Sequence, residues 1–325
     1  MWLQKKKKKK KKKNKLFCRY SYRMGHMLLN GTIIWSKTYS FKSSPFPGQS
    51  SLQRVIIFGD MGKAERDGSN EYACYQPGSL ITTDQLISDL DNYDIVFHIG
   101  DMPYANGYLS QWDQFTAQVE PIASVKPYMV ASGNHERSWP NSGGFMLLKI
   151  LVGSVVCLPR PCTMYSTDYG MFHFCIADSE HDWREGSEQY AWIEKCLASV
   201  DRKKQPWLIF SAHRVLGYSS NSWYAQEGSF EEPMGREHLQ KLWQKYKVDI
   251  AFYGHVHNYE RTCPIYQVLF PSFIIIILLP LFFICTISLG GLGGRLIMHH
   301  VVALIAERQG GTCTNRPLSR LLSVM

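Results

Sequence analysis

The chain has 325 residues, 45% of them hydrophobic, which is enough for one large domain or two modest ones around a sizeable core. Its formal net charge of +9 is equalled by the nine consecutive lysines at residues 5–13, so the rest of the chain is formally neutral. The charge therefore gives no support to a basic nucleic-acid-binding face, and we expect no nucleic-acid partner.

The first predicted segment is a low-complexity lysine tail at residues 1–16. We expect it to be disordered, because like charges along a homopolymer repel one another. No apolar stretch follows the charged N-terminus, so no signal peptide is readable in this chain.

Residues 17–50 alternate polar and apolar side chains and end in Pro45-Phe46-Pro47-Gly48. This pattern predicts the last strands of a small β domain followed by a linker, a remnant too short to be stable alone. Asn30 begins the one glycosylation sequon, Asn30-Gly31-Thr32, which matters only if the chain is secreted.

Residues 51–264 alternate short apolar runs with segments of helical spacing, which predicts an α/β fold. Apolar residues at helical spacing predict helices at 82–90, 188–200 and 236–246. The runs that predict buried strands are residues 55–58, 95–99, 128–131, 207–210 and 250–253.

Two segments do not fit this alternation. Residues 146–161 are largely apolar but carry no turn or motif, and we interpret them as an atypical insert. Residues 265–325 form a tail of different character, in which residues 268–289 carry no charge. That segment is long enough to span a bilayer, since prolines are tolerated in membrane helices. A membrane-tethered product is therefore one hypothesis for this chain.

Nine cysteines show no Cys-x-x-Cys pair, which argues against a zinc–thiolate site. The odd number leaves at least one thiol unpaired in a monomer. The cysteines alone thus leave the redox compartment open.

Each of the five predicted strands is followed by a short polar string. Side chains at the carboxyl ends of strands converge at one edge of an α/β sheet, where ligands bind. A pair of metal ions about 3.5–4 Å apart needs hard oxygen ligands, neutral imidazoles and a carboxylate able to bridge, and it can hold a phosphate and activate a water. The strings supply seven candidate metal ligands: Asp60, Asp101, Tyr104, Asn134, His213, His255 and His257.

The order of the strings resembles the purple acid phosphatases of the calcineurin-like metallophosphoesterase superfamily, in particular the large plant type. The strings read Asp60-Met61-Gly62, Gly100-Asp101-Met102-Pro103-Tyr104, Gly133-Asn134-His135-Glu136, Ser211-Ala212-His213 and Gly254-His255-Val256-His257. The similarity covers roughly residues 19–145 and 165–264. It implies a metallophosphoesterase-type β-sandwich flanked by helices, preceded by the remnant of a small fibronectin-like β domain.

The resemblance also implies roles for the candidate residues. Ferric iron would be held by Asp60, Tyr104 and His257. A second divalent metal (zinc, manganese or iron) would be held by Asn134, His213 and His255, and Asp101 would bridge the two. His135 would lie beside the phosphate as a catalytic residue. The implied reaction is hydrolysis of a phosphate monoester by a metal-bound hydroxide.

The sequence departs from the family near the leaving group. Active members have a histidine about ten residues after the fourth string, and this chain has none there. Tyr224 is the candidate replacement, but a phenol with a reference pKa near 10 is a poor acid. Losing a general acid typically costs about 10²–10⁴ in rate. The second hypothesis is therefore a metal-containing phosphate-binding relative with weak or no turnover.

The resemblance implies a location in the secretory pathway, outside the cell or in the vacuole. The segment 268–289 leaves contact with a membrane open. The sequence does not decide between a monomer and a homodimer.

Overall fold

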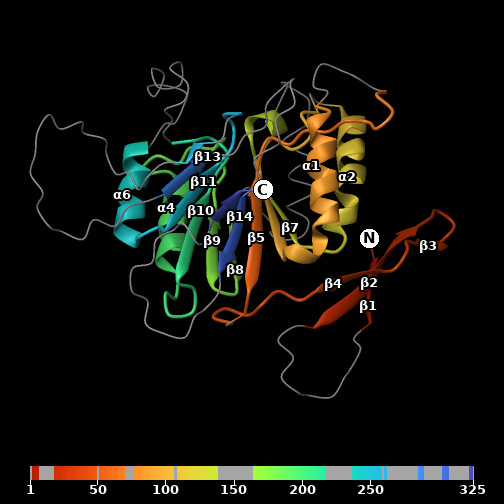
Figure 1. The fold of residues 1–325 in the computed structure, drawn as a ribbon, viewed down its shortest axis with the longest axis horizontal. Helices are drawn as coiled ribbons and strands as arrows, with labels where there is room; N and C mark the ends of the chain where they lie inside the picture. Colours follow the sequence, from red (N-terminus) through yellow and green to blue (C-terminus); the bar gives the residue numbers. More distant parts are fainter. Residues whose placement is uncertain are drawn as a thin grey trace, which may run out of the picture.

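The computed structural model describes residues 2–6, 18–49, 51–69, 76–105, 108–137, 164–216, 236–257, 260–261, 285–288, 302–306 and 322–324. The predicted insert at 146–161, Tyr224 and most of the apolar segment 268–289 lie outside these ranges. Two β-sheets face one another at the centre of the molecule, with helices on both outer faces (Figure 1).

The first sheet has the strand order β15-β14-β5-β6-β7. Its three parallel strands, β5, β6 and β7, carry the first three polar strings at their carboxyl ends. The strand bounds are β5 (Gln53–Phe58), β6 (Ile95–Ile99), β7 (Tyr128–Ala131), β14 (Val302–Ala306) and β15 (Leu322–Val324).

The second sheet has the order β12-β13-β11-β10-β9-β8. Strands β9, β10, β11 and β13 run parallel, and β10 and β11 lead into the two histidine strings. The bounds are β8 (Tyr165–Tyr169), β9 (Phe172–Ile176), β10 (Trp207–Ser211), β11 (Ile250–Tyr253), β12 (Glu260–Arg261) and β13 (Cys285–Ser288).

The main core lies between the two sheets. Side chains alternate along a strand, so Val55 and Ile57 of β5 point into this core while Ile56 and Phe58 point outward. The rings of Phe97 and Phe174 meet across it, with centroids 4.3 Å apart. The chain therefore folds as the helix-flanked β-sandwich that the sequence predicted.

Two helices cover the outer face of each sheet (Figure 1). The helices α1 (Gly78–Ser88) and α2 (Leu109–Ala123) pack on the first sheet, and α4 (Glu188–Ala198) and α6 (Arg236–Tyr246) on the second. Two single turns, η1 (Leu90–Asn92) and η2 (Asn134–Arg137), complete the helical elements of the described chain. Ser187 caps α4 by accepting a hydrogen bond from the Tyr190 amide.

A small antiparallel sheet lies beside the sandwich and includes three strands from residues 17–50. It joins β1 (Trp2–Lys6), β2 (Arg19–Met27), β3 (Ile33–Trp35) and β4 (Tyr39–Lys42). The Tyr22 hydroxyl donates to the Ser124 carbonyl oxygen at 2.8 Å, which fastens this sheet to the end of α2. Residues 2–6 were expected to belong to a disordered tail, but they pair with β2.

Residues of the C-terminal tail add strands to both large sheets. β13 extends the second sheet beside β11, and β14 runs antiparallel to β5 in the first. In the part of the chain that the structure describes, no helix is both long and apolar enough to cross a bilayer. Within the predicted apolar segment 268–289, residues 285–288 belong to strand β13.

Candidate metal centre

The five polar strings meet at the carboxyl ends of β5, β6, β7, β10 and β11. The two parallel strand sets present these ends to one another at the same edge of the sandwich. All seven predicted metal ligands lie in the described part of the chain. Asp60, Asp101 and His213 are buried, and Tyr104 is 4% exposed.

Three of the predicted ligands form one tight group. The Tyr104 hydroxyl donates to Asp60 Oδ1 at 3.1 Å and lies 2.9 Å from His257 Nε2. His257 Nε2 is in turn 3.3 Å from Asp60 Oδ1. A phenol, a carboxylate and an imidazole thus converge on a common point from three different strand ends.

The remaining four predicted ligands gather around His213. Its Nε2 lies 3.2 Å from Asn134 Oδ1 and 3.2 Å from Asp101 Oδ2. The His255 ring packs against the His213 ring with centroids 5.2 Å apart. One donor atom from each of Asp101, His213 and His255 lies within 4.8 Å of the others.

Backbone contacts fix the direction of these side chains. His213 Nδ1 lies 2.9 Å from the carbonyl oxygen of Ile99, a partner that holds a proton on Nδ1 and turns Nε2 toward the site, where its lone pair is free in the neutral imidazole. Asp60 Oδ2 accepts the His255 amide at 2.9 Å, and Asp101 Oδ1 accepts the His135 amide at 2.8 Å. Each carboxylate is therefore held by a neighbouring string.

Backbone strain is concentrated at the same place. Among the described residues, five that are not glycine have a positive φ, and Lys247 is the one outside the site. The other four are Asp60 (φ 57°), Asp101 (51°), Tyr104 (53°) and His255 (70°). Such conformations cost about 1–3 kcal/mol each and persist where the surrounding structure requires them. Here they aim donor groups at one point.

Glycines let the strings approach closely. A Cβ on Gly133 would lie 2.3 Å from Asp101 Oδ1, and one on Gly254 would lie 2.6 Å from Asp60 Oδ2. Real Cβ atoms do not come so near, so neither position admits a side chain without moving a carboxylate. Gly133 and Gly254 are therefore packing requirements of the site.

Glu136 supports the site through the backbone, because its carboxylate oxygens bind backbone amides and are not metal-ligand candidates. Its two carboxylate oxygens accept the amides of Asp101, Met102 and Gly133 at 2.6–2.8 Å. These contacts fasten the second and third strings to one another, so Glu136 orients its neighbours. Burial, with the nearby Asp101 charge, raises the pKa of Glu136 to about 7.

The buried charges strongly perturb the histidines. Burial alone would lower the pKa of His213, but Asp101 and Asp60 outweigh it and raise the pKa to about 10. Burial, together with the positive charge of His213, lowers the pKa of His255 to about 4. Burial and the Asp60 carboxylate raise the pKa of Tyr104 well above its ordinary value. Tyr104 therefore ionises in this place only if a strong positive charge compensates it.

The donor set fits a pair of hard or borderline metal ions. It offers carboxylate, phenol and amide oxygens with three imidazoles, and it buries two carboxylates side by side, an arrangement that is costly without cations. His135 lies at the rim, its ring 4.4 Å from that of Tyr104. Tyr224, the other predicted catalytic residue, lies outside the described residues.

Sequence reasoning missed Arg214, which follows His213 directly. Its guanidinium pairs with Glu180 Oε1 at 2.5 Å, and its amide donates to Ser179 Oγ at 3.0 Å. Its positive charge also contributes to lowering the pKa of His255. The signal for this residue was its position beside a predicted ligand.

A family model described as calcineurin-like phosphoesterase matches residues 53–259, more than half of the chain. The chain belongs to the calcineurin-like phosphoesterase family. The matched range includes all seven predicted ligands, and the family consists of hydrolases that act on phosphate esters.

Within the phosphoesterase family, similar proteins carry the purple acid phosphatase name. "Probable inactive purple acid phosphatase 27" of Arabidopsis thaliana is 75% identical over 261 residues, which are 77% of this chain and 42% of the relative. A "Nucleotide pyrophosphatase/phosphodiesterase" of Hordeum vulgare is 71% identical over 248 residues, which are 73% of this chain and 67% of the relative. This chain therefore spans less than half of the length of the Arabidopsis relative.

A solved purple acid phosphatase from yellow lupin (Lupinus luteus) seeds has the same fold. It matches with a TM-score of 0.76 and 58% identity over 89% of this chain and 55% of the lupin chain. The predicted resemblance and the predicted fold are both confirmed.

Proposed function

We propose that the cluster is a binuclear metal centre that hydrolyses phosphate esters, with phosphate monoesters as the substrate class. The observation that supports this most is the convergence of seven oxygen and nitrogen donors at one edge of the sandwich. The positive φ values at four of them indicate that the fold accepts strain to place these donors.

In this proposal ferric iron binds the group of Asp60, Tyr104 and His257. The second ion (zinc, manganese or iron) binds Asn134, His213 and His255, and Asp101 lies between the two. The support is that the donor atoms of the first group lie within 3.3 Å of one another and that Asn134 and Asp101 both face His213 Nε2 at 3.2 Å. When bound, the ions supply Lewis acidity toward phosphate oxygens and an activated water.

His135 is assigned to the phosphate itself. Its amide holds the Asp101 carboxylate, and its ring lies against Tyr104 at the edge of the donor group. Burial lowers the pKa of His135, so the imidazole is neutral at pH 7 and can donate a hydrogen bond or exchange a proton with a bound phosphate ester. Tyr224 remains our candidate for protonating the leaving group.

The first test is a visible absorption spectrum of the purified chain after reconstitution with iron. A tyrosinate bound to ferric iron gives the purple band of this family, so wild type should show it and Tyr104→Phe should lose it together with bound iron. Tyr108→Phe is the matched control, because Tyr108 is 54% exposed and outside the cluster. A band that persists in Tyr104→Phe would refute the iron assignment.

A weak or inactive enzyme is the alternative. Its support is the missing histidine near Tyr224 and the word "inactive" in the name of the 75% identical relative. In that case the metal centre still assembles, while hydrolysis of a chromogenic monoester stays near background. Tyr224→His should then raise the rate; an unchanged rate in a fully metallated variant would count against a missing acid as the cause.

The name of the barley relative favours a second substrate class, the nucleotide pyrophosphates and phosphodiesters. Assays of a chromogenic monoester and a chromogenic nucleotide diester on the same metallated sample separate the two classes. A higher kcat/KM for the diester would replace monoesters as the proposed substrate.

We also propose that the protein passes through the secretory pathway and carries a glycan on Asn30. Asn30 is exposed in the turn between β2 and β3, where its Oδ1 accepts the Thr32 amide at 3.0 Å. Treatment of the plant-expressed protein with an endoglycosidase should reduce its mass, and Asn30→Gln should remove this shift.

Carbonate extraction tests the membrane-tethered hypothesis, which release of the chain into the soluble fraction would end.

A further inference from the structure

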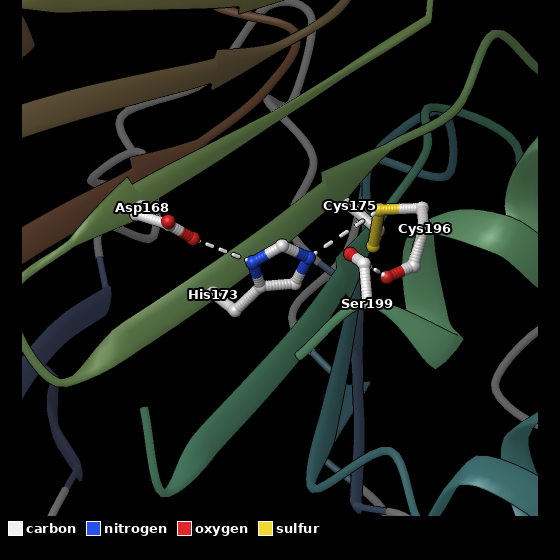
Figure 2. Close-up of a disulfide and its surroundings, with 5 residues drawn as sticks. All are labelled: Asp168, His173, Cys175, Cys196 and Ser199. Atoms are coloured by element: carbon white, nitrogen blue, oxygen red, sulfur yellow. Dashed lines mark hydrogen bonds and ion pairs between the residues drawn. A yellow bond between two sulfur atoms is a disulfide. The ribbon is translucent and has the colours of Figure 1, made fainter. Parts of the chain in front are cut away.

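A second group of side chains of the types that can bind metals lies on the outer face of the six-stranded sheet, between β9 and α4 (Figure 2). His173 and Cys175 alternate along β9 and point toward α4, whereas the intervening Phe174 points into the core between the sheets. Cys196 approaches from the last turn of α4 and forms a disulfide with Cys175. One donor atom from each of these three residues lies within 4.8 Å of the others.

The His173 ring is oriented by a carboxylate. Asp168 of β8 stands directly opposite His173 in the strand pairing, and its Oδ1 lies 2.6 Å from His173 Nδ1. A carboxylate in this position holds the ring proton on Nδ1, so the lone pair of Nε2 points the other way. Nε2 lies 3.6 Å from Cys196 Sγ (Figure 2). Metal-binding histidines usually have such a carboxylate behind the ring, and here the free nitrogen faces a cysteine sulfur.

The group can be reached from solvent. A cavity of about 240 Å³ lies beside it, lined by Ser166, Thr167, Asp168, His173, Ser199 and Gln205. The Asp168 side chain is 41% exposed, whereas His173 is 6% exposed. The cavity therefore offers an entry path and room for a water molecule beside the imidazole.

We propose that His173, Cys175 and Cys196 bind a Zn²⁺ ion, or a divalent ion of similar softness, when the two cysteines are in the dithiol state. Two thiolates and one imidazole with an open fourth position are a zinc donor set. Binding releases two thiol protons to solvent and uses the Nε2 lone pair, so the buried ion and its two thiolates carry no net charge. Sulfurs in such a site are about 3.8 Å apart. The Cα atoms are 6.2 Å apart, so side-chain rotation can separate the sulfurs that far.

The disulfide and the metal exclude one another, because a disulfide has no thiolate to offer. The site is thus available before the two cysteines are oxidised, or after a reductant has converted the disulfide back to two thiols. In the laboratory a phosphine does this: it takes the oxygen of one water, becomes the phosphine oxide, and leaves two protonated thiols. The proposal does not depend on the proposed function, since it uses none of the seven donors of the first cluster.

Cobalt distinguishes the two clusters in one sample. The donors of the first cluster are oxygen and nitrogen only, so a sulfur-to-cobalt charge-transfer band in the near ultraviolet reports the second. The full chain, stripped of metal by a chelator, is titrated with Co²⁺ before and after phosphine treatment. We expect the reduced chain to bind one further equivalent with this band, and Zn²⁺ to displace it.

Three variants assign the band to this group. Cys196→Ser should abolish it. Cys18→Ser should not change it, because Cys18 is an exposed free cysteine directly before β2. Asp168→Asn should keep the band but weaken Zn²⁺ affinity about 10–100-fold, the usual cost of losing a carboxylate behind a histidine ligand. A purely structural Asp168 would leave the affinity unchanged.

Circular dichroism of each sample shows whether it is folded. A folded, reduced chain that gains no cobalt, or a band that survives Cys196→Ser, would overturn the proposal. A reduced chain that unfolds even with Zn²⁺ present would overturn it as well, because the three donors meet only when α4 packs on β9.

Discussion

The two donor groups of this molecule are built in opposite ways. The first lies at the carboxyl ends of the strands, where Asp60 and Asp101 are buried near one another and the backbone is strained at four donors. The second lies within the packing of α4 on β9, and its two sulfurs join in a bond that needs no counter-charge. The first arrangement requires cations to balance it, while the second is complete when oxidised.

This difference separates function from stability. Buried carboxylates and positive φ values cost folding free energy and are typical of sites that act on a ligand. The disulfide joins two cysteines that are 21 residues apart in the sequence. It stabilises the fold by restricting the conformations of the unfolded chain. Changes in the first group should therefore act on metal content and rate, and changes in the second on unfolding.

The largest effect is expected from Asp101→Asn. This carboxylate lies 3.2 Å from His213 Nε2, one of the donors proposed for the second ion. Loss of a residue that merely supports a ligand already costs about 10–100-fold in metal affinity or activity, so loss of this one should cost more. Metal analysis and a phosphoester assay on the same sample test this. Unchanged metal content and rate would mean that the cluster is not the active centre.

Gly133→Ala should have the next largest effect, because the added Cβ would displace the Asp101 carboxylate. The new Cβ would meet Asp101 Oδ1 at 2.3 Å and the Asp101 amide nitrogen at 2.6 Å, so the carboxylate must move. We expect lost metal and rate in a chain that still folds. Gly31→Ala is the control, because its Cβ would meet nothing within 4 Å and its positive φ costs only stability. Equal metal loss in both variants would mean that the close approach at Gly133 is not the cause.

The sequence predicted the first group and not the second, for a physical reason. The sequence signal of a ligand at a strand end is local, because an apolar run followed by Gly-Asp or Gly-His occupies only a few consecutive residues. The partition of the donors between two ions came only from the family resemblance, since each group takes residues from non-adjacent strings. The disulfide has no such signature, because nine cysteines at irregular spacing allow many pairings and only the packing of α4 on β9 selects one.

The same contrast applies to the fold. The strands that carry the polar strings lie where the apolar runs predicted, and α6 has the predicted bounds. The helix α2 was missed: it begins after Tyr108, which gives no side-chain cap, so the sequence carries no start signal there. The pairing of β14 with β5 joins residues far apart in the chain, and no local pattern could indicate that partner.

Removing the disulfide tests the stabilising side of the comparison. Cys175→Ser combined with Cys196→Ser should lower the free energy of unfolding by about 3 kcal/mol, the value for a loop of roughly this length. Metal content at the first cluster and the rate should stay at the wild-type level. Denaturant unfolding with a metal assay checks both. A large loss of rate in the folded variant would show that the two groups are coupled.

The narrowest prediction is a pH dependence of stability that only the metal-free chain should show. The folded pKa of His213 is about 10 against an ordinary value of 6.5, because Asp101 and Asp60 outweigh its burial. The folded state therefore binds the extra proton, and the stability it contributes is fully present below pH 6.5 and lost as pH rises toward 10. Unfolding measured from pH 7 to 10 should show this fall in metal-free wild type and a shallower one in His213→Gln. A metal ion takes the place of the proton, so the metallated chain should lack the slope; the same slope in all three samples would assign it to groups outside the centre.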